Sequence, residues 1–193
     1  MLNVLYEEFP NYVLVHGIHY GIETDFREWI RFSELVEDDT VQWQEKVELM
    51  LRWYRENAPD DLEAALYALG DFLAARSLYK SREEELCDKS DNECKEPVFS
   101  FSEDAGCIYS AFVDCYGIDL QRVPYMHWWK FRTLFDGLPQ STEIKQRIMY
   151  RSMDANLIKD KEERRRVKRI QKAIALKKKN RHMSDYEIGD VFA

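Results

Sequence analysis

The hydrophobic positions near the N-terminus follow a strand period over two short runs. These runs occupy residues 12–15 and 18–22, and they are separated by His16-Gly17. A two-residue connection of this kind suits a tight hairpin, because glycine accepts a positive φ angle at the second turn position. The pattern therefore predicts a small N-terminal β-hairpin.

Helical periodicity dominates the rest of the chain. Thr24 or Asp25 can cap a helix that ends near Glu37, and a second apolar stripe begins at Trp43. A third helix is predicted to have its first turn at Pro59-Asp60-Asp61, because proline lacks an amide donor that a helix start does not use. The predicted apolar row of this third helix is Leu62, Leu66, Leu69 and Leu73.

A helix that Gly117 ends is predicted next, followed by a helix that opens at Pro124. Projection at about 100° per residue places Trp129 with Tyr125 and Arg132 on the more polar side of that second helix. The ring of Trp129 then needs either a neighbouring segment of the chain or a partner to cover it. The opposite, apolar face carries Trp128, Phe131, Leu134, Phe135 and Leu138.

Two polar segments complete the pattern. Residues 77–96 are rich in acidic side chains and are expected to form a mobile loop. Residues 159–179 predict a basic helix whose narrow apolar stripe consists of Val167, Ile170 and Ile174. The expected fold is mainly α: a small N-terminal hairpin, a compact multi-helix domain over residues 1–158, and a basic helical arm with a short acidic tail over residues 159–193.

Charge divides the chain at the same place. Residues 1–158 carry 16 Lys/Arg against 30 Asp/Glu, residues 159–182 carry 12 against 3, and residues 183–193 carry 3 acidic residues alone, which gives the total of −8. The basic arm has three interpretations: a solvated helix balanced by the acidic body, a docking segment for another protein, or a nucleic-acid contact. Nucleic acid is the least favoured of the three, and its binding would depend on salt and not on sequence, because no aromatic residue interleaves the basic ones to stack bases.

Candidate chemistry is sparse. The sequence contains no Gly-rich phosphate loop, no Gly-x-Ser-x-Gly elbow and no His-Glu-x-x-His motif, and its four cysteines lack the Cys-x2-Cys spacing of zinc sites. His127 is expected to be a buried neutral ring with a hydrogen bond. We therefore expect no enzyme, no catalytic residue, no cofactor and no metal site. No run approaches the roughly 18 apolar residues of a membrane span, so we expect a cytoplasmic protein that does not enter the membrane.

Five stretches in this order carry a family resemblance: LYEEFP, HGIHYGIETDFREWIRF, VPYMHWWKFRTLFDGLP, YRSMD and IKDKEERRR. They resemble the bacteriophage gene-product-fifteen family, which is encoded in the tail module of long-tailed phages and prophages of Gram-positive bacteria. The resemblance covers roughly residues 5 to 170. It implies a role in tail assembly within the host bacterial cytoplasm, since the family's genes lie between those for the tail tube and the tape-measure protein.

The resemblance leads to an interaction protein as the expected function. A chaperone-like tail-assembly factor would bind the tape-measure protein or the tail tube protein during tail morphogenesis, and a homo-oligomer is possible. Alternative functions are a structural subunit retained in the mature tail and a nucleic-acid-binding accessory protein that uses the basic arm. The candidate partner-binding residues are Tyr125, Trp129, Arg132, Val167, Ile170 and Ile174.

Overall fold

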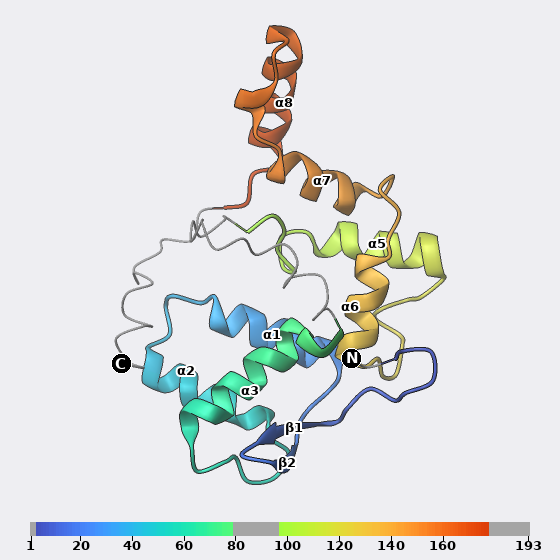
Figure 1. Ribbon diagram of the computed structural model, residues 1–193. Coiled ribbons are helices and arrows are strands. Elements are labelled where there is room, and N and C mark those ends of the chain that lie inside the picture. Colours follow the sequence, from blue (N-terminus) through green and yellow to red (C-terminus); the bar gives the residue numbers. More distant parts are fainter. Residues whose placement is uncertain (1–2, 79–96, 178–193) are drawn as a thin grey trace. The chain divides into compact units, whose positions relative to one another are not determined.

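The computed structural model describes residues 3–78 and 97–177, which form two compact units (Figure 1). Of the described residues, the first unit contains 3–78 and 125–131, and the second contains 97–124 and 132–177. The boundary expected after residue 158 was drawn from charge, and it stays a prediction. The expected mobile loop lies outside the described residues from residue 79 onward, as does the end of the basic arm.

A β-hairpin opens the first unit, as predicted. Strands β1 (Tyr12–Val15) and β2 (Ile18–Gly21) pair antiparallel, with Val13 opposite Tyr20. The two turn residues His16 and Gly17 both have positive φ angles, of 50° and 78°. This combination defines the type I′ turn that matches the twist of the flanking strands.

A later segment of the chain pairs with the end of β2. The Arg55 amide donates to the Gly21 carbonyl (3.0 Å), and the Glu23 amide donates to the Trp53 carbonyl (2.8 Å). Ile22 and Tyr54 form an isolated bridge between these two bonds. The end of this edge of the hairpin is thereby covered by the protein itself.

Three helices pack with the hairpin: α1 (Phe26–Val36), α2 (Trp43–Met50), which continues into the 3-10 turn η1 (Leu51–Trp53), and α3 (Leu62–Ala74). The Asp25 side chain caps α1 by accepting from the Arg27 amide. This unit holds all five tryptophans of the chain. Its buried apolar side chains include Val13, Val15, Phe26, Trp29, Phe32, Met50, Tyr54, Leu69 and Phe72.

Helix α3 differs from its prediction in two respects. It begins at Leu62, because the Asp61 side chain accepts from the Ala64 amide and so fixes the start after the predicted first turn. Its buried row contains Ala65, Ala68, Leu69 and Phe72, whereas Leu62 is half exposed. The small alanines let the helix pack closely against its neighbours, and the predicted row omitted them because it was drawn from the leucines alone.

Helix α6 (Trp128–Asp136) begins four residues after Pro124, and so the predicted start was wrong. Residues 125–127 are extended instead, because their backbone pairs with the residues before α1 (see below). The apolar face of the helix is as predicted at Trp128, Phe131, Phe135 and Leu138, all of which are buried.

The second unit contains α5 (Ala105–Tyr116), α7 (Glu143–Ser152), the 3-10 turn η2 (Ala155–Leu157) and α8 (Lys161–Ala173). Gly117 ends α5 with a φ angle of 64°, as its position in the sequence predicts. The mainly α fold with an N-terminal hairpin and a basic C-terminal helix is confirmed. None of the helices within the described ranges is long and apolar enough to cross a membrane.

Candidate partner-binding surfaces

The segment before α6 lies beside the segment before α1. The Phe26 amide donates to the Met126 carbonyl (2.9 Å), and the Trp128 amide donates to the Thr24 carbonyl (2.8 Å). The hydroxyl groups of Thr24 and Tyr125 are 2.8 Å apart. Tyr125 therefore lies in an extended segment and does not share a helix face with Trp129, although half of its side chain is exposed.

The two adjacent tryptophans hold the C-terminal end of α3. The Trp128 indole N–H donates to the Leu73 carbonyl, and the Trp129 indole N–H donates to the Phe72 carbonyl, each at 2.9 Å. The last carbonyls of a helix are not all bonded within it, and the indoles supply donors at this end, although the Phe72 carbonyl also accepts from the Ala75 amide (3.1 Å). The Trp129 ring is only 4% exposed and stacks on Phe72 at 5.0 Å. A neighbouring segment of the same chain thus covers Trp129.

His127 ties the N-terminal segment to the start of α6. Its Nδ1 accepts from the Trp129 amide (3.0 Å), so its Nε2 carries the proton and donates to the Pro10 carbonyl (3.0 Å). Phe9 stacks on the ring at 4.9 Å. Burial lowers the pKa of His127, and the bond to Pro10 opposes this only in part. Both nitrogens of the neutral ring are committed to holding the fold.

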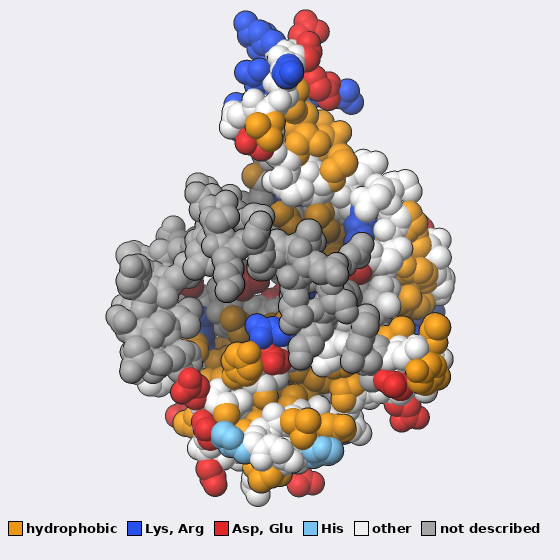
Figure 2. Space-filling view, in the orientation of Figure 1, with side chains coloured by type: hydrophobic (Ala, Val, Ile, Leu, Met, Phe, Trp, Pro, Cys, Tyr) orange, Lys and Arg blue, Asp and Glu red, His pale blue; other side chains and the backbone are white. Residues whose placement is uncertain are grey.

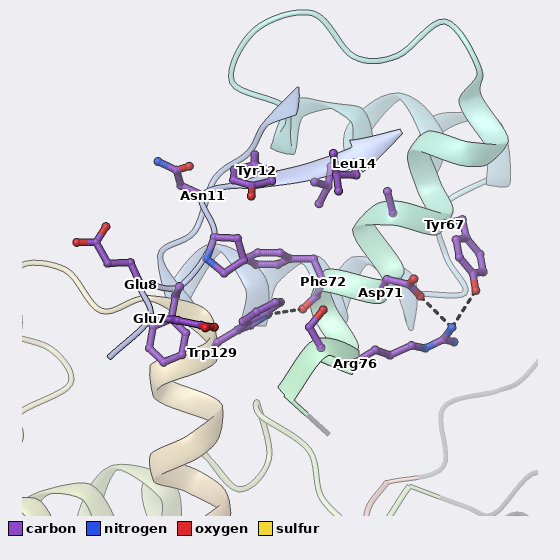
Figure 3. Close-up of a pocket in the computed structure, with 15 residues that line it drawn as sticks. Glu7, Glu8, Asn11, Tyr12, Leu14, Tyr67, Asp71, Phe72, Arg76 and Trp129 are labelled. Carbon is purple, nitrogen blue, oxygen red and sulfur yellow. Dashed lines mark hydrogen bonds and ion pairs between the residues drawn. The ribbon is translucent and has the colours of Figure 1, made fainter. Parts of the chain in front are cut away.

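A groove of about 820 Å³ lies beside β1 in the first unit (Figure 3). We call it the β1 groove. Its first wall is the continuous stretch of residues 7–14, which runs from the N-terminal segment into β1. Trp129 also lines the groove, and its second wall, from α3 and the residues after it, consists of Tyr67, Ala68, Asp71, Phe72, Arg76 and Ser77.

Large apolar side chains on both walls of the β1 groove are open to solvent. Leu14 of β1 is 57% exposed and Tyr67 of α3 is 63% exposed, while Tyr12 is also exposed. Exposed apolar surface that lines a concavity is typical of an interaction site. None of these three residues was a candidate from the sequence, since the strand period marks Tyr12 and Leu14 only as one face of a hairpin, and Tyr67 is not in the apolar row predicted for α3.

Acidic side chains dominate the charge of the β1 groove. Glu7 and Glu8 are exposed at one end of the first wall. On the second wall, Arg76 forms an ion pair with Asp71 (3.0 Å) and donates to the Tyr67 hydroxyl (2.9 Å), as Figure 3 shows. The positive charge of Arg76 is therefore matched within its own wall, and the two glutamates give the groove a negative balance.

The apolar stripe of α8 packs within the second unit. Val167 is 2% exposed, and Ile170 and Ile174 are half-buried. The Gln171 side chain donates to the carbonyls of Tyr150 (2.8 Å) and Met153 (2.7 Å), which fixes α8 against the end of α7. These contacts cover much of the stripe that was a candidate for partner binding. The sixth candidate, Arg132, is half-buried in the second unit.

The opposite side of α8 is strongly cationic. Figure 2 shows Lys and Arg side chains gathered over this helix, together with a few acidic ones. Projected at about 100° per residue, five of the exposed cations of α8 fall within one face, whereas Arg166, which pairs with Glu163, lies outside it. This cationic face consists of Lys161, Arg165, Lys168, Arg169 and Lys172, all exposed.

A buried ion network joins the end of α8 to α7 and to the start of α5. Asp104, which is 0% exposed, accepts from both terminal nitrogens of Arg151 (2.6 and 3.0 Å) and from Arg147 (3.1 Å). Arg151 also donates through Nε to the Ile174 carbonyl at the end of α8 (2.8 Å). Burial alone would raise the pKa of Asp104, but hydrogen bonds from Arg151 and from the Ser100 amide outweigh it and lower the pKa.

The described residues show no group of three or more His, Cys, Asp or Glu that could hold a metal ion. Burial is the main cause that raises the pKa of the Cys107 thiol, and its hydrogen bond to Glu143 raises the pKa further. Cys107 is thus a thiol at neutral pH and a poor nucleophile. These surfaces offer apolar contacts, backbone hydrogen bonds and charge.

The sequence model of one family, described as "Bacteriophage Gp15 protein", matches residues 5–176 of the chain. No match was found among curated proteins or among solved structures.

Proposed function

Because the chain belongs to the Bacteriophage Gp15 protein family, we propose that it is a chaperone-like tail-assembly factor that binds the tape-measure protein or the tail tube protein. The observation that carries this proposal is the family match over nearly the whole chain, since the resemblance described above implies a gene in the tail module. The protein would act by covering surfaces of the partner until the tube polymerises, without making or breaking a bond.

The surfaces of both units support a binding role. The first unit offers a groove with exposed Tyr12, Leu14 and Tyr67, and the second offers the cationic face of α8. The residues that could suggest catalysis are occupied in other ways, because both nitrogens of His127 hold backbone groups and the pKa of Cys107 is raised. A groove that combines exposed apolar side chains with charged ones suits recognition of another polypeptide.

Co-expression with each candidate partner tests the proposal. The chain carrying an affinity tag is produced with the tape-measure protein of the same phage, and separately with the tail tube protein, and complexes are isolated from the host. We expect a complex with at least one of them at micromolar concentration or below. Failure of both folded partners to bind would refute the proposed function.

The fate of the protein separates the assembly factor from a structural subunit of the mature tail. Mass spectrometry of purified virions should detect the tube and tape-measure proteins and no peptide of this chain. Detection of this chain in virions at a fixed ratio to the tube protein would establish it as a structural subunit instead.

The cationic face of α8 favours nucleic acid as the ligand in a second candidate function. Contacts to phosphates would depend steeply on salt and would not depend on sequence. Binding to generic duplex DNA is measured for the intact chain and for a variant in which Lys161, Arg165, Lys168, Arg169 and Lys172 are changed to Gln. Tight binding at low salt that the variant loses would favour this function over the first.

A further inference from the structure

We propose that the outer edge of β1 binds an extended, basic segment of a partner protein, which joins the hairpin as a third strand. This inference rests on the proposed function and specifies how the partner is held. It predicts backbone hydrogen bonds to alternate residues of β1, apolar contacts in the β1 groove, and a Lys or Arg of the segment beside Glu7 and Glu8.

The hydrogen-bond register shows which backbone groups are available. The Ile22 amide donates to the Asn11 carbonyl (3.1 Å), so Asn11 is a hydrogen-bonded position of the antiparallel pair. The backbone groups of every second residue in a strand point to the same side, and those of Val13 and Val15 therefore also bond to β2. Tyr12 and Leu14 direct their N–H and C=O groups to the other side. Within residues 3–78 and 97–177, these outward groups have no hydrogen-bond partner.

The two edges of the hairpin thus differ. Residues 53–55 pair with the end of β2 at Gly21 and with Glu23 just beyond it, whereas no segment of residues 3–78 and 97–177 pairs with the edge of β1, which presents two donors and two acceptors in a row. An exposed strand edge can pair with another strand, and proteins usually prevent this with a covering segment, a β-bulge or charged side chains. Here both outward residues of β1 carry exposed apolar side chains, Tyr12 and Leu14, and neither is charged.

The β1 groove provides the space for the added strand. Residues of β1 line it and no residue of β2 does, which places it on the open side of the hairpin. Residues 7–14 line it continuously, and a stretch of this length spans about 26 Å when extended. Its half-buried Phe9 and its exposed Leu14 and Tyr67 can contact alternate side chains of an incoming strand.

Charge complementarity identifies the occupant as a basic segment. Glu7 and Glu8 lie at one end of the groove, and its Arg76 is already paired with Asp71. In the first unit as a whole, the described residues carry 16 Asp/Glu against 7 Lys/Arg. The last residues of this chain, 183–193, carry three acidic residues and no basic one, so charge disfavours them as the strand.

Peptide binding tests the identity of the segment. Overlapping twelve-residue peptides that cover the tape-measure protein, the tail tube protein, every other protein of the same phage and this chain itself are screened for binding to the full-length protein. We expect binders that combine alternating apolar residues with Lys or Arg. Absence of any binding peptide, or binders that come only from this chain, would overturn the proposal.

Hydrogen exchange tests the mode of binding. When the strongest peptide is bound, the amides of Tyr12 and Leu14 should gain at least tenfold protection, whereas those of Val13 and Val15, already bonded to β2, should change little. This alternation is specific to strand addition. Protection that does not alternate along β1, or that appears only elsewhere, would refute the inference.

Two pairs of variants supply matched controls. Leu14→Pro removes an outward amide and blocks the edge, and it should weaken peptide binding at least tenfold, whereas Leu14→Thr keeps the amide and should bind within about threefold. Glu7→Lys with Glu8→Lys should weaken binding about tenfold or more, and Glu45→Lys with Glu48→Lys, an exposed pair on α2, should not. Equal effects within either pair would contradict the proposal, and the charge pair tests it even if Leu14→Pro disturbs the hairpin.

The outcomes for the two proposals are distinguishable. If the tape-measure or tube protein binds but the amides of Tyr12 and Leu14 are unaffected, the proposed function stands and the strand-addition inference fails. If a basic peptide from another phage protein joins β1 while neither tail protein binds, the inference stands and the proposed function fails.

Discussion

Replacement of Asp104 by Asn should destabilise the second unit and loosen α8. The carboxylate is fully buried and accepts two hydrogen bonds from Arg151 and one from Arg147. Asparagine keeps one oxygen acceptor but removes the negative charge, and its NH2 group then faces a guanidinium donor. Because the Arg151 side chain is itself only 9% exposed, its charge is left without compensation.

The expected loss is about 3 kcal/mol in the free energy of opening of this unit, at the lower end of the 3–5 kcal/mol typical for breaking a buried pair. The lower end applies because the Arg147 side chain is 28% exposed and retains Glu143 as a partner. Hydrogen exchange read by mass spectrometry, on peptides from α5, α7 and α8, gives this free energy directly. The exposed Asp114 of α5, changed to Asn, is the matched control and should cost less than about 0.5 kcal/mol.

The effect of pH gives this prediction a second test. The pKa of Asp104 is lowered in the folded protein, so its stabilisation is fully present above the unfolded pKa, near 4, and is lost as the pH falls through the folded value. The difference between wild type and Asp104→Asn should therefore shrink on acidification toward about pH 2. A difference below about 1 kcal/mol at pH 7, or one that does not shrink in acid, would refute the reasoning.

Three further predictions concern single contacts. Trp129→Ala should reduce the free energy of unfolding of the first unit by about 3–5 kcal/mol in urea titrations, because the buried indole fills space and holds the Phe72 carbonyl; a stable variant that only loses partner binding would show that the ring is a contact residue. Since burial lowers the pKa of His127, stability should fall as the pH drops below the unfolded value of about 6.5, and His127→Phe should remove this dependence in urea titrations at pH 7 and pH 5. Gln171→Ala should increase hydrogen exchange in α8 by about tenfold, because two hydrogen bonds to α7 are lost, whereas Lys168→Ala, which loses one exposed bond to Asn156, should change it less than threefold; equal rates in the two variants would contradict this assignment.

The sequence predicted the elements whose signals are local. The turn with a positive φ angle at Gly17, the cap of α1 at Asp25, which was one of two candidates, and the end of α5 at Gly117 depend on single residues and their neighbours, and the structure has all three. The start of α6 depends instead on residues about a hundred positions away, since Thr24 and Phe26 bind the backbone that would otherwise form its first turn. No local pattern can report such a pairing.

The candidate site was predicted less well for a related reason. Trp129 was placed on the polar side of a helix, and its cover, α3, could not be identified from spacing along the chain. Conversely, Tyr12, Leu14 and Tyr67 have the same residue types as buried positions, and only the folded chain shows that they border an open groove. The ion network at Asp104 was also missed, although its Arg151 belongs to the YRSMD stretch that carried the family resemblance.

The confinement of every tryptophan to the first unit has a spectroscopic consequence. Excitation at the red edge of indole absorption does not excite the tyrosines of the second unit. The fluorescence therefore depends only on the environment of the tryptophans in the first unit. A segment that enters the space beside Trp129 should alter the emission, whereas an event confined to α8 should leave it unchanged. Tryptophan fluorescence can therefore assign a binding event to one of the two units without an added label.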